Sequence, residues 1–287
     1  MSLWAELSQT HVSPKYEKVS HSVRKNLWIS FWLSVVEVLL ILQKAIGYGV
    51  ANPWTDVWNF LLKTEIPNAC LPIGAIPTIA ASGSEMSGSC VITNEDGWLK
   101  RGSTRSDLCR PKFTLMNPRL TYTLPEYQTE SGCVDILLHT MERYFVNIET
   151  MEITDSISES LMQTVIYNAR ILLNEPGNYN ARAEIMWAGS LSHNGLTGCG
   201  TGGGDWACHQ LEHELGGLYD VTHGAGLAAL WGSWARYVYD ANPERFAQFA
   251  TNIFDIPCFA DYENTALAGI EAMEDIFPFN PYADQPS

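Results

Sequence analysis

Residues 206–226 read WACHQLEHELGGLYDVTHGAG and contain three of the seven histidines in the chain. His209 and His213 are four residues apart, so they share one face if this stretch is helical. His223 follows the expected helix end at Gly216 and Gly217, where a turn can return a third imidazole to the same place. Such spacing is typical of metal ligands.

Asp135 and His139 form a second pair at the same spacing, in the stretch CVDILLHTMERYF. Neutral imidazoles combined with one carboxylate suit a divalent transition ion such as iron or zinc. A single histidine pair on a helix is more often a surface or core feature than a site. Two pairs and His223 leave a metal site and an ordinary structural role both open on spacing alone.

Residue identity adds a family resemblance. The segments DWACHQLEHELGGLYDVTHGAGLA, DILLH at 135–139 and PIGAIPTIAASGSEMSGSCVITN at 72–94 closely resemble the iron-containing alcohol dehydrogenase family, in particular its butanol-dehydrogenase-like branch. The similarity runs from about Trp4 to about Asp275, with one interruption. The resemblance implies that one Asp and three His hold a divalent metal, Fe²⁺ in the first place and Zn²⁺ as the alternative. The implied ligands are Asp135, His139, His209 and His223, with His213 beside the reacting atoms.

The family also implies an architecture of two domains. Residues 1–122 would form a partial α/β, Rossmann-like dinucleotide-binding domain, and residues 123–287 a truncated all-α metal-binding domain, as in dehydroquinate synthase. The proline-bracketed segment 118–125 marks the expected junction. After it, hydrophobic periodicity predicts helices at 127–146, 154–173, 180–196, 204–216, 223–239 and 243–253, with Asp155 and Asn242 as N-caps.

Residues 72–94 are expected to form a buried strand, a turn containing Ser82, and a second strand. Spacing alone favours an ordinary hairpin loop here, whereas the resemblance places the loop against a nicotinamide cofactor. It implies Thr78 and Ser82 as cofactor-binding residues, with Ile79 replacing a threonine that the family often has. Lys100 matches a family lysine near the nicotinamide ribose. Without the resemblance, the basic stretch that contains Lys100 is interpreted as a charged face exposed to solvent.

The most apolar run is LWISFWLSVVEVLLIL at 27–42. It is shorter than the roughly 20 residues of a membrane span and contains Glu37, so a buried strand followed by a helix is the better interpretation. No glycine lies between Leu27 and Ile46, where the family has a GGGS turn for the pyrophosphate. One hypothesis is that residues 27–43 and 277–287 are frameshifted translation, which resequencing the DNA would test. The chain is also expected to lack the family's opening strand and its last helices.

Composition excludes some partners. The net charge of −15 and the pI of about 4.8 argue against nucleic acid, which requires clustered Lys and Arg. Seven cysteines without CxxC spacing, and no signal peptide, predict reduced thiols and a cytoplasmic protein without a membrane anchor. Cys133 and Cys208 are read as packing residues.

Two other features are given no functional role. The glycine-rich segment 197–204 is not a phosphate loop, because no strand precedes it, and it is expected to break the chain before the helix of His209. His193 has no partner at useful spacing, and with His11 and His21 it is predicted to be structural or exposed.

The resemblance implies an NAD(P)(H)-dependent enzyme that interconverts a primary alcohol and an aldehyde, with His213 relaying the proton because imidazole titrates near neutral pH. It also suggests a homodimer with small-molecule substrates. Two alternatives remain open: a catalytically silent metal-binding fragment without the pyrophosphate loop, and a metal-dependent hydrolase or lyase on the same scaffold.

Overall fold

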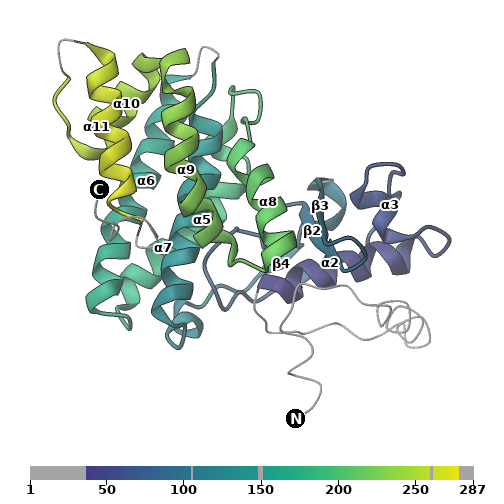
Figure 1. Cartoon of the computed structure of the whole chain (residues 1–287). Coiled ribbons are helices and arrows are strands. Elements are labelled where there is room, and N and C mark those ends of the chain that lie inside the picture. Colours follow the sequence, from purple (N-terminus) through teal and green to yellow (C-terminus); the bar gives the residue numbers. More distant parts are fainter. Residues whose placement is uncertain (1–36, 105, 148–150, 259–260, 278–287) are drawn as a thin grey trace.

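The computed structural model describes residues 37–104, 106–147, 151–258 and 261–277. Figure 1 shows an α/β part at one end, which contains α2, α3 and the strands, and a group of long helices at the other. The order of the two parts along the chain is the expected one. Each part has its own cluster of buried hydrophobic side chains.

The N-terminal part of the described chain contains short strands in two small sheets. β1 pairs in parallel with β4, and β2 pairs antiparallel with β3 so that Ile92 lies opposite Arg101. Since β1 and β2 belong to different sheets, the alternative of one ordinary hairpin across residues 72–94 is wrong. The elements are α2 (Glu37–Ala51), α3 (Val57–Leu61), β1 (Gly74–Ala75), β2 (Ser89–Asn94), β3 (Leu99–Thr104), α4 (Ser106–Cys109) and β4 (Phe113–Thr114).

The apolar run at 27–42 ends in helix α2, as expected for its second half. The strand expected at its start lies outside the described residues. Tyr48 of α2 is buried, and its ring meets the ring of Phe60 edge-on at a centroid distance of 5.9 Å. Within the described ranges, no helix combines the length and apolar character that a membrane crossing requires.

The C-terminal part is helical, and each of the six helices predicted from periodicity forms. A short turn, η1 (Pro118–Thr121), lies at the expected junction between the two parts. The helices are α5 (Glu126–Tyr144), α6 (Glu152–Asn174), α7 (Tyr179–His193), α8 (Ala207–Tyr219), α9 (His223–Val238), α10 (Pro243–Phe254) and α11 (Tyr262–Glu274), with η2 (Leu196–Gly198) and η3 (Tyr239–Ala241) between them.

One of the two predicted helix caps is confirmed. The side chain of Asn242 accepts a hydrogen bond from the backbone N–H of Arg245 at the start of α10. The prediction for Asp155 is wrong, because α6 begins earlier and Met151 occupies the N-cap position. Asp155 lies in the first turn instead, where its carboxylate forms a buried ion pair with Arg245.

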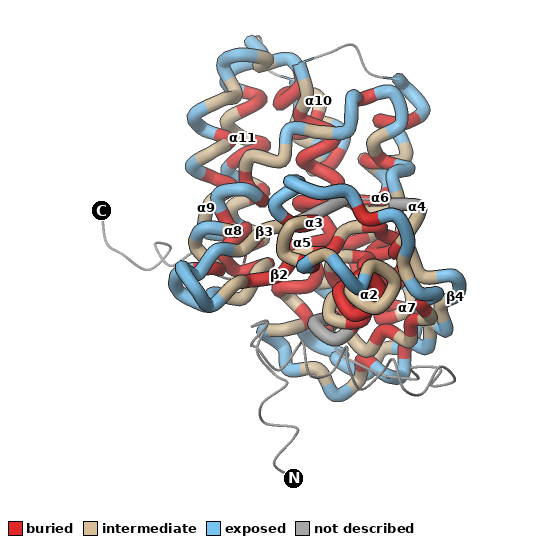
Figure 2. The backbone as a smooth tube through the Cα atoms, turned by 90° about the vertical axis from the view of Figure 1, so that its right-hand side faces the viewer, coloured by how far each residue is buried: buried red, intermediate tan, exposed pale blue. Residues whose placement is uncertain are grey.

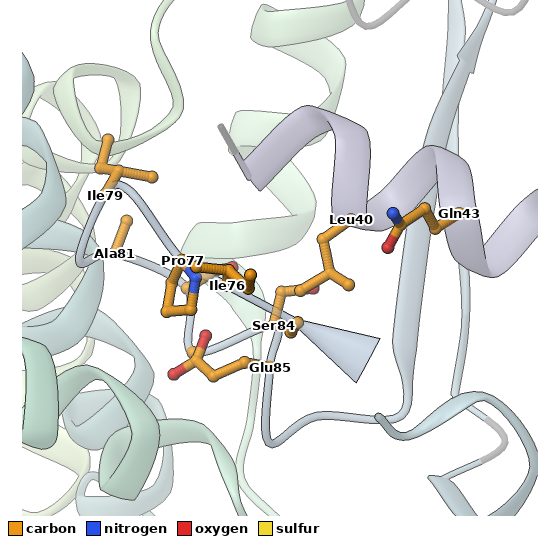
Figure 3. Close-up of a pocket in the computed structure, with 11 residues that line it drawn as sticks. Leu40, Gln43, Ile76, Pro77, Ile79, Ala81, Ser84 and Glu85 are labelled. Carbon is orange, nitrogen blue, oxygen red and sulfur yellow. The ribbon is translucent and has the colours of Figure 1, made fainter. Parts of the chain in front are cut away.

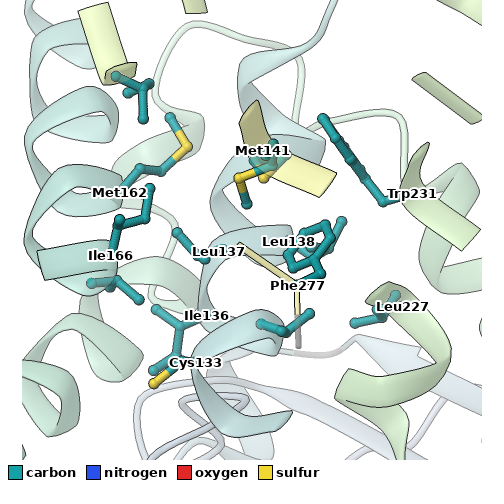
Figure 4. Packing of buried hydrophobic residues seen from close by; sticks show 14 of the residues in the cluster. Cys133, Ile136, Leu137, Leu138, Met141, Met162, Ile166, Leu227, Trp231 and Phe277 are labelled. Carbon is teal, nitrogen blue, oxygen red and sulfur yellow. The ribbon is translucent and has the colours of Figure 1, made fainter. Parts of the chain in front are cut away.

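Helix α5 is the central element of the helical part. It packs against α6, α7 and α9, and every residue from 131 to 144 is buried (Figure 2). Figure 4 shows Leu137, Leu138 and Met141 of α5 among side chains from the neighbouring helices, such as Trp231. Polar side chains on such a helix have no access to water, so they need partners inside the protein.

Candidate metal centre

Helix α5 places the first pair of predicted ligands in the interior. Asp135 and His139 are one helical turn apart, and His139 Nδ1 lies 3.3 Å from Asp135 Oδ1. Their side chains are 4–5% exposed, which is unusual for a carboxylate without a cationic partner. This low exposure indicates that the pair belongs to a buried site and does not lie on the protein surface.

Two further helices bring imidazoles to the same oxygen. His209 is in the first turn of α8, and His223 is the first residue of α9. The Nε2 atoms of both lie 3.7 Å from Asp135 Oδ1. The four side chains predicted as ligands thus come together, from segments that are far apart in the sequence.

The approach of α9 to α5 depends on Gly224, the residue after His223. A Cβ at this position would lie 1.9 Å from the backbone oxygen of Ser131. Only glycine permits α9 to begin so close to α5, which is what brings His223 within reach of Asp135.

The atoms that face one another at this site have no other partners. Asp135 Oδ1, His139 Nδ1 and His209 Nε2 are buried, and within the described part of the chain none of them has a hydrogen bond. A buried polar group left unpaired costs about 1–3 kcal/mol, so three at one point imply something that satisfies them together. Ligand atoms of Asp135, His139 and His209 lie within 4.8 Å of one another, and His223 reaches this group through the 3.7 Å between its Nε2 and Asp135 Oδ1, whereas His223 also lies close to Glu212 and His213. One carboxylate with imidazoles is a ligand set that suits a divalent ion such as Fe²⁺ or Zn²⁺.

Two buried glutamates orient the imidazoles of α8 and α9. Glu142 Oε1 accepts hydrogen bonds from the backbone N–H of His209, at 2.9 Å, and from its Nδ1, at 3.0 Å. Glu212 holds the Nδ1 of His223 in the same way. With Nδ1 engaged in each ring, Nε2 is directed toward Asp135, as in metal sites where a carboxylate fixes the ligand tautomer.

Neither glutamate was predicted from the sequence, although the spacing of each from a ligand is a usable signal. Glu142 follows His139 by three positions on α5, and Glu212 follows His209 by three positions on α8, so each shares a helix face with a ligand.

The change Glu142→Gln is expected to weaken metal binding about 10- to 100-fold, the usual loss when a partner behind a ligand is removed. A chelator competition titration with Zn²⁺ measures the affinity. Glu126→Gln provides a matched control, because Glu126 is exposed at the start of the same helix. Equal affinities for the two variants would contradict the role given to Glu142.

The charge states of two of these histidines are set by their surroundings. Burial, together with the neighbouring His193 and His209, lowers the pKa of His139 well below its ordinary value, so this ring is neutral. Burial also acts to lower the pKa of His209, but Asp135 and Glu142 outweigh it and raise the net value.

His213 lies beside His223, one of the predicted ligands. Its ring centroid is 5.9 Å from that of His223. Burial, Lys100 and His223 lower the pKa of His213 to about 3. It is a neutral base at physiological pH.

The three predicted cofactor residues occupy two places. Thr78 and Ser82 are in the loop between β1 and β2, and Ser82 lines a pocket with Leu40 and Gln43 of α2 (Figure 3). Lys100 lies on β3, away from that loop. Its Nζ is 3.0 Å from Glu212 Oε2 and 3.5 Å from the Nδ1 of His223. Lys100 therefore connects the α/β part to the candidate metal centre.

Lys44, which sequence analysis did not single out, stabilises the loop that follows Ser82. The Lys44 side chain is fully buried, and its Nζ donates to backbone oxygens of Ser84, Ser87 and Ser89 at 2.8–2.9 Å. This ammonium group thereby fixes one wall of the pocket.

The structure places the predicted packing cysteines and His193. Cys133 and Cys208 are buried among hydrophobic side chains, as predicted, and burial raises the pKa of Cys133 to about 12. All seven cysteines are free thiols. His193 packs inside the protein, which agrees with the structural alternative of its prediction: the centroid of its ring lies 4.0 Å from that of His139. No sequence spacing indicated this contact, which depends on how α7 crosses α5.

Comparison with protein-family models gives two matches. Residues 129–278 match the model described as "Fe-containing alcohol dehydrogenase family, C-terminal", and residues 42–118 match "Iron-containing alcohol dehydrogenase". The first match contains all of the residues that meet at the candidate metal centre except Lys100. The second begins just before Lys44, where the sequence resemblance resumes.

Individual relatives point to the same group. The chain is 36% identical over 272 residues to the probable NADH-dependent butanol dehydrogenase 1 of Bacillus subtilis, which covers 93% of this chain and 70% of that protein. It is 37% identical over 236 residues to NADH-dependent butanol dehydrogenase A of Clostridium acetobutylicum, a match that covers 82% of this chain and 60% of that protein. It is 31% identical to an NADPH-dependent aldehyde reductase of Escherichia coli, a match that covers 92% of this chain and 69% of that protein. The chain thus spans about two thirds of the length of these relatives.

A solved structure supports the fold. The NADH-dependent butanol dehydrogenase A of Thermotoga maritima superposes with a TM-score of 0.85 at 34% identity, covering 92% of this chain and 65% of that one. The expected architecture, a Rossmann-like α/β part followed by a helical part, is confirmed by this similarity and by the helices observed here.

Proposed function

The chain belongs to the iron-containing alcohol dehydrogenase family, and on this premise we propose that it interconverts a primary alcohol and an aldehyde by hydride transfer with NAD(P)(H). The observation that carries the proposal is the convergence of His139, His209 and His223 on one oxygen of Asp135. We propose these four residues as ligands of one divalent ion, Fe²⁺ in the first place and Zn²⁺ as the alternative. Such an ion supplies a Lewis acid that polarises a carbonyl and lowers the pKa of an alcohol.

The residues around the ligands have separate tasks in this proposal. Glu142 and Glu212 hold the rings of His209 and His223 so that their Nε2 atoms face Asp135. The imidazole of His213, whose ring lies beside that of His223, is the group we propose to relay the proton exchanged with the substrate hydroxyl. Lys100 offsets the charge of Glu212.

We further propose that Thr78, Ser82 and Lys100 contact the nicotinamide cofactor, which supplies or accepts the hydride. Of the three, Ser82 lines a pocket, which supports this placement for Ser82. Relatives named for NADH and for NADPH both match the chain, so the proposal covers either nucleotide. The boundary between a nucleotide-binding domain, 1–122, and a metal-binding domain, 123–287, is part of the same proposal, as is a homodimer.

One observation favours a second candidate function. Between Leu27 and Ile46 the sequence has no glycine for a pyrophosphate turn, and the match to the family model begins only at residue 42. A chain without that turn would bind metal through Asp135 and the histidines but would not bind a dinucleotide. This candidate is a catalytically silent metal-binding protein.

One assay separates the two functions. Purified protein is incubated with Fe²⁺ or Zn²⁺, butanal and either NADH or NADPH, and the absorbance of the reduced nicotinamide is followed. Metal-dependent consumption of the cofactor supports the dehydrogenase. Metal binding without consumption, together with no cofactor binding by calorimetry, supports the silent protein. If the protein binds no metal at all, both proposals are wrong.

A further inference from the structure

The three histidines of the candidate metal centre differ in what holds their rings. His209 and His223 each have a ring nitrogen on a buried glutamate. The ring of His139 has no such support within the described residues, where Asp135, which its Nδ1 faces at 3.3 Å, is the one carboxylate in ion-pair distance. Something other than a second carboxylate must therefore define the plane of the His139 ring.

Other rings pack against the ring of His139. The His193 ring is the nearest, with a centroid distance of 4.0 Å and an angle of 42° between the planes. The indole of Trp206 meets the His139 ring edge-on at 5.8 Å. Packing at this distance restricts rotation of the His139 ring about its Cβ–Cγ bond.

His193 is itself fixed by Arg143. Arg143 Nη2 lies 3.2 Å from His193 Nδ1, and because a guanidinium can only donate, this nitrogen is the acceptor and the ring is the Nε2–H tautomer. Arg143 in turn donates to the backbone oxygens of His139 and Ser192, and its guanidinium lies 4.5 Å from the centre of the Trp206 ring. Arg143 is therefore held by contacts on several sides.

The glycine-rich segment explains how Arg143 is enclosed. A Cβ at Gly198 would lie 2.8 Å from Arg143 Cδ, and a Cβ at Gly204 would lie 2.8 Å from the backbone oxygen of Glu142. Gly204 also has a φ of +100°, which few other residues adopt. These glycines let the segment 197–204 lie directly against the C-terminal end of α5. Packing against α5 therefore explains why the segment is rich in glycine.

We propose that His193, anchored by Arg143, is a positioning residue that fixes the ring plane of His139 for metal binding. The inference rests on the proposed metal centre. It states that the ring of His139 is held by packing against another ring, whereas the rings of His209 and His223 are held by carboxylates. It predicts that the flat ring at position 193 matters more than its nitrogen atoms.

The test compares His193→Leu, which removes the flat ring, with His193→Phe, which keeps it. Trp187→Leu is the matched control, because it removes an aromatic ring from the same helix at a position that is 50% exposed. Co²⁺ affinity is measured by chelator competition, and the absorption spectrum of bound Co²⁺ reports ligand geometry. Thermal unfolding of the metal-free variants shows whether the fold is intact.

His193→Leu is expected to bind Co²⁺ about tenfold more weakly, with an altered spectrum. His193→Phe keeps the ring but loses the hydrogen bond from Arg143, so it should lose clearly less affinity, and Trp187→Leu should resemble the unchanged protein. The inference is overturned if His193→Leu keeps the original affinity and spectrum. It is also overturned if His193→Phe is impaired as strongly as His193→Leu. Failure of the unchanged protein to bind Co²⁺ would instead refute the metal centre itself, so the two failures are distinguishable.

Discussion

Replacing Asp135 by Asn is expected to weaken metal binding by at least about 100-fold. Removing a residue that only hydrogen-bonds a ligand already costs about 10- to 100-fold, and Asp135 is itself a proposed ligand. Asp135 is the single anionic group among the four predicted ligands, and its Oδ1 is the atom on which the three histidines converge. A carboxamide keeps the shape but loses the charge that attracts a divalent ion. Any cofactor-dependent activity should disappear with the metal.

The measurement is a Zn²⁺ competition titration on both forms of the protein. Asp240→Asn is the control, since Asp240 is exposed and far along the chain from the ligands. Without metal, Asp135→Asn should be no less stable to heat than the original protein, because the change removes a buried charge. Unchanged Zn²⁺ affinity in this variant would contradict the assignment of Asp135.

Replacing Asp155 by Leu is expected to destabilise the helical part by about 3–5 kcal/mol, the usual cost of leaving one member of a buried ion pair alone. Arg245 donates from Nη1 and Nη2 to the two carboxylate oxygens of Asp155, each at 2.7 Å. Its Nε donates to the backbone oxygen of Tyr144, and its guanidinium lies 3.6 Å from the centre of the Tyr144 ring. These contacts connect α6 and α10 to the end of α5.

Urea denaturation of three variants measures the effect. The double change Asp155→Leu with Arg245→Met removes both charges, so it should recover most of the stability that the single change loses. If Asp155→Leu alone is as stable as the double variant, the ion pair does not contribute as described.

The helical part was largely predictable because its signals are local. Apolar periodicity gave the helices from α5 to α10, and the spacing of Asp135 and His139 gave a shared helix face. The family resemblance then predicted which side chains meet, and the structure brings them together. Their role as metal ligands stays a prediction until an ion is observed.

The missed features depend on how helices cross, which local patterns do not contain. Glu142 reaches His209 of another helix, and His193 reaches His139 across the contact of α7 with α5. Asp155 was read as a cap because it begins an apolar pattern. The helix starts one turn earlier, and a distant arginine, Arg245, binds the carboxylate.

The most direct test is an anomalous difference map, measured at the zinc absorption edge from a crystal of the Zn²⁺-loaded protein. One peak is predicted, at about 2.0–2.2 Å from an oxygen of Asp135 and from one ring nitrogen each of His139, His209 and His223. A map without a peak among these four side chains, or with zinc bound only elsewhere, would contradict the proposed centre.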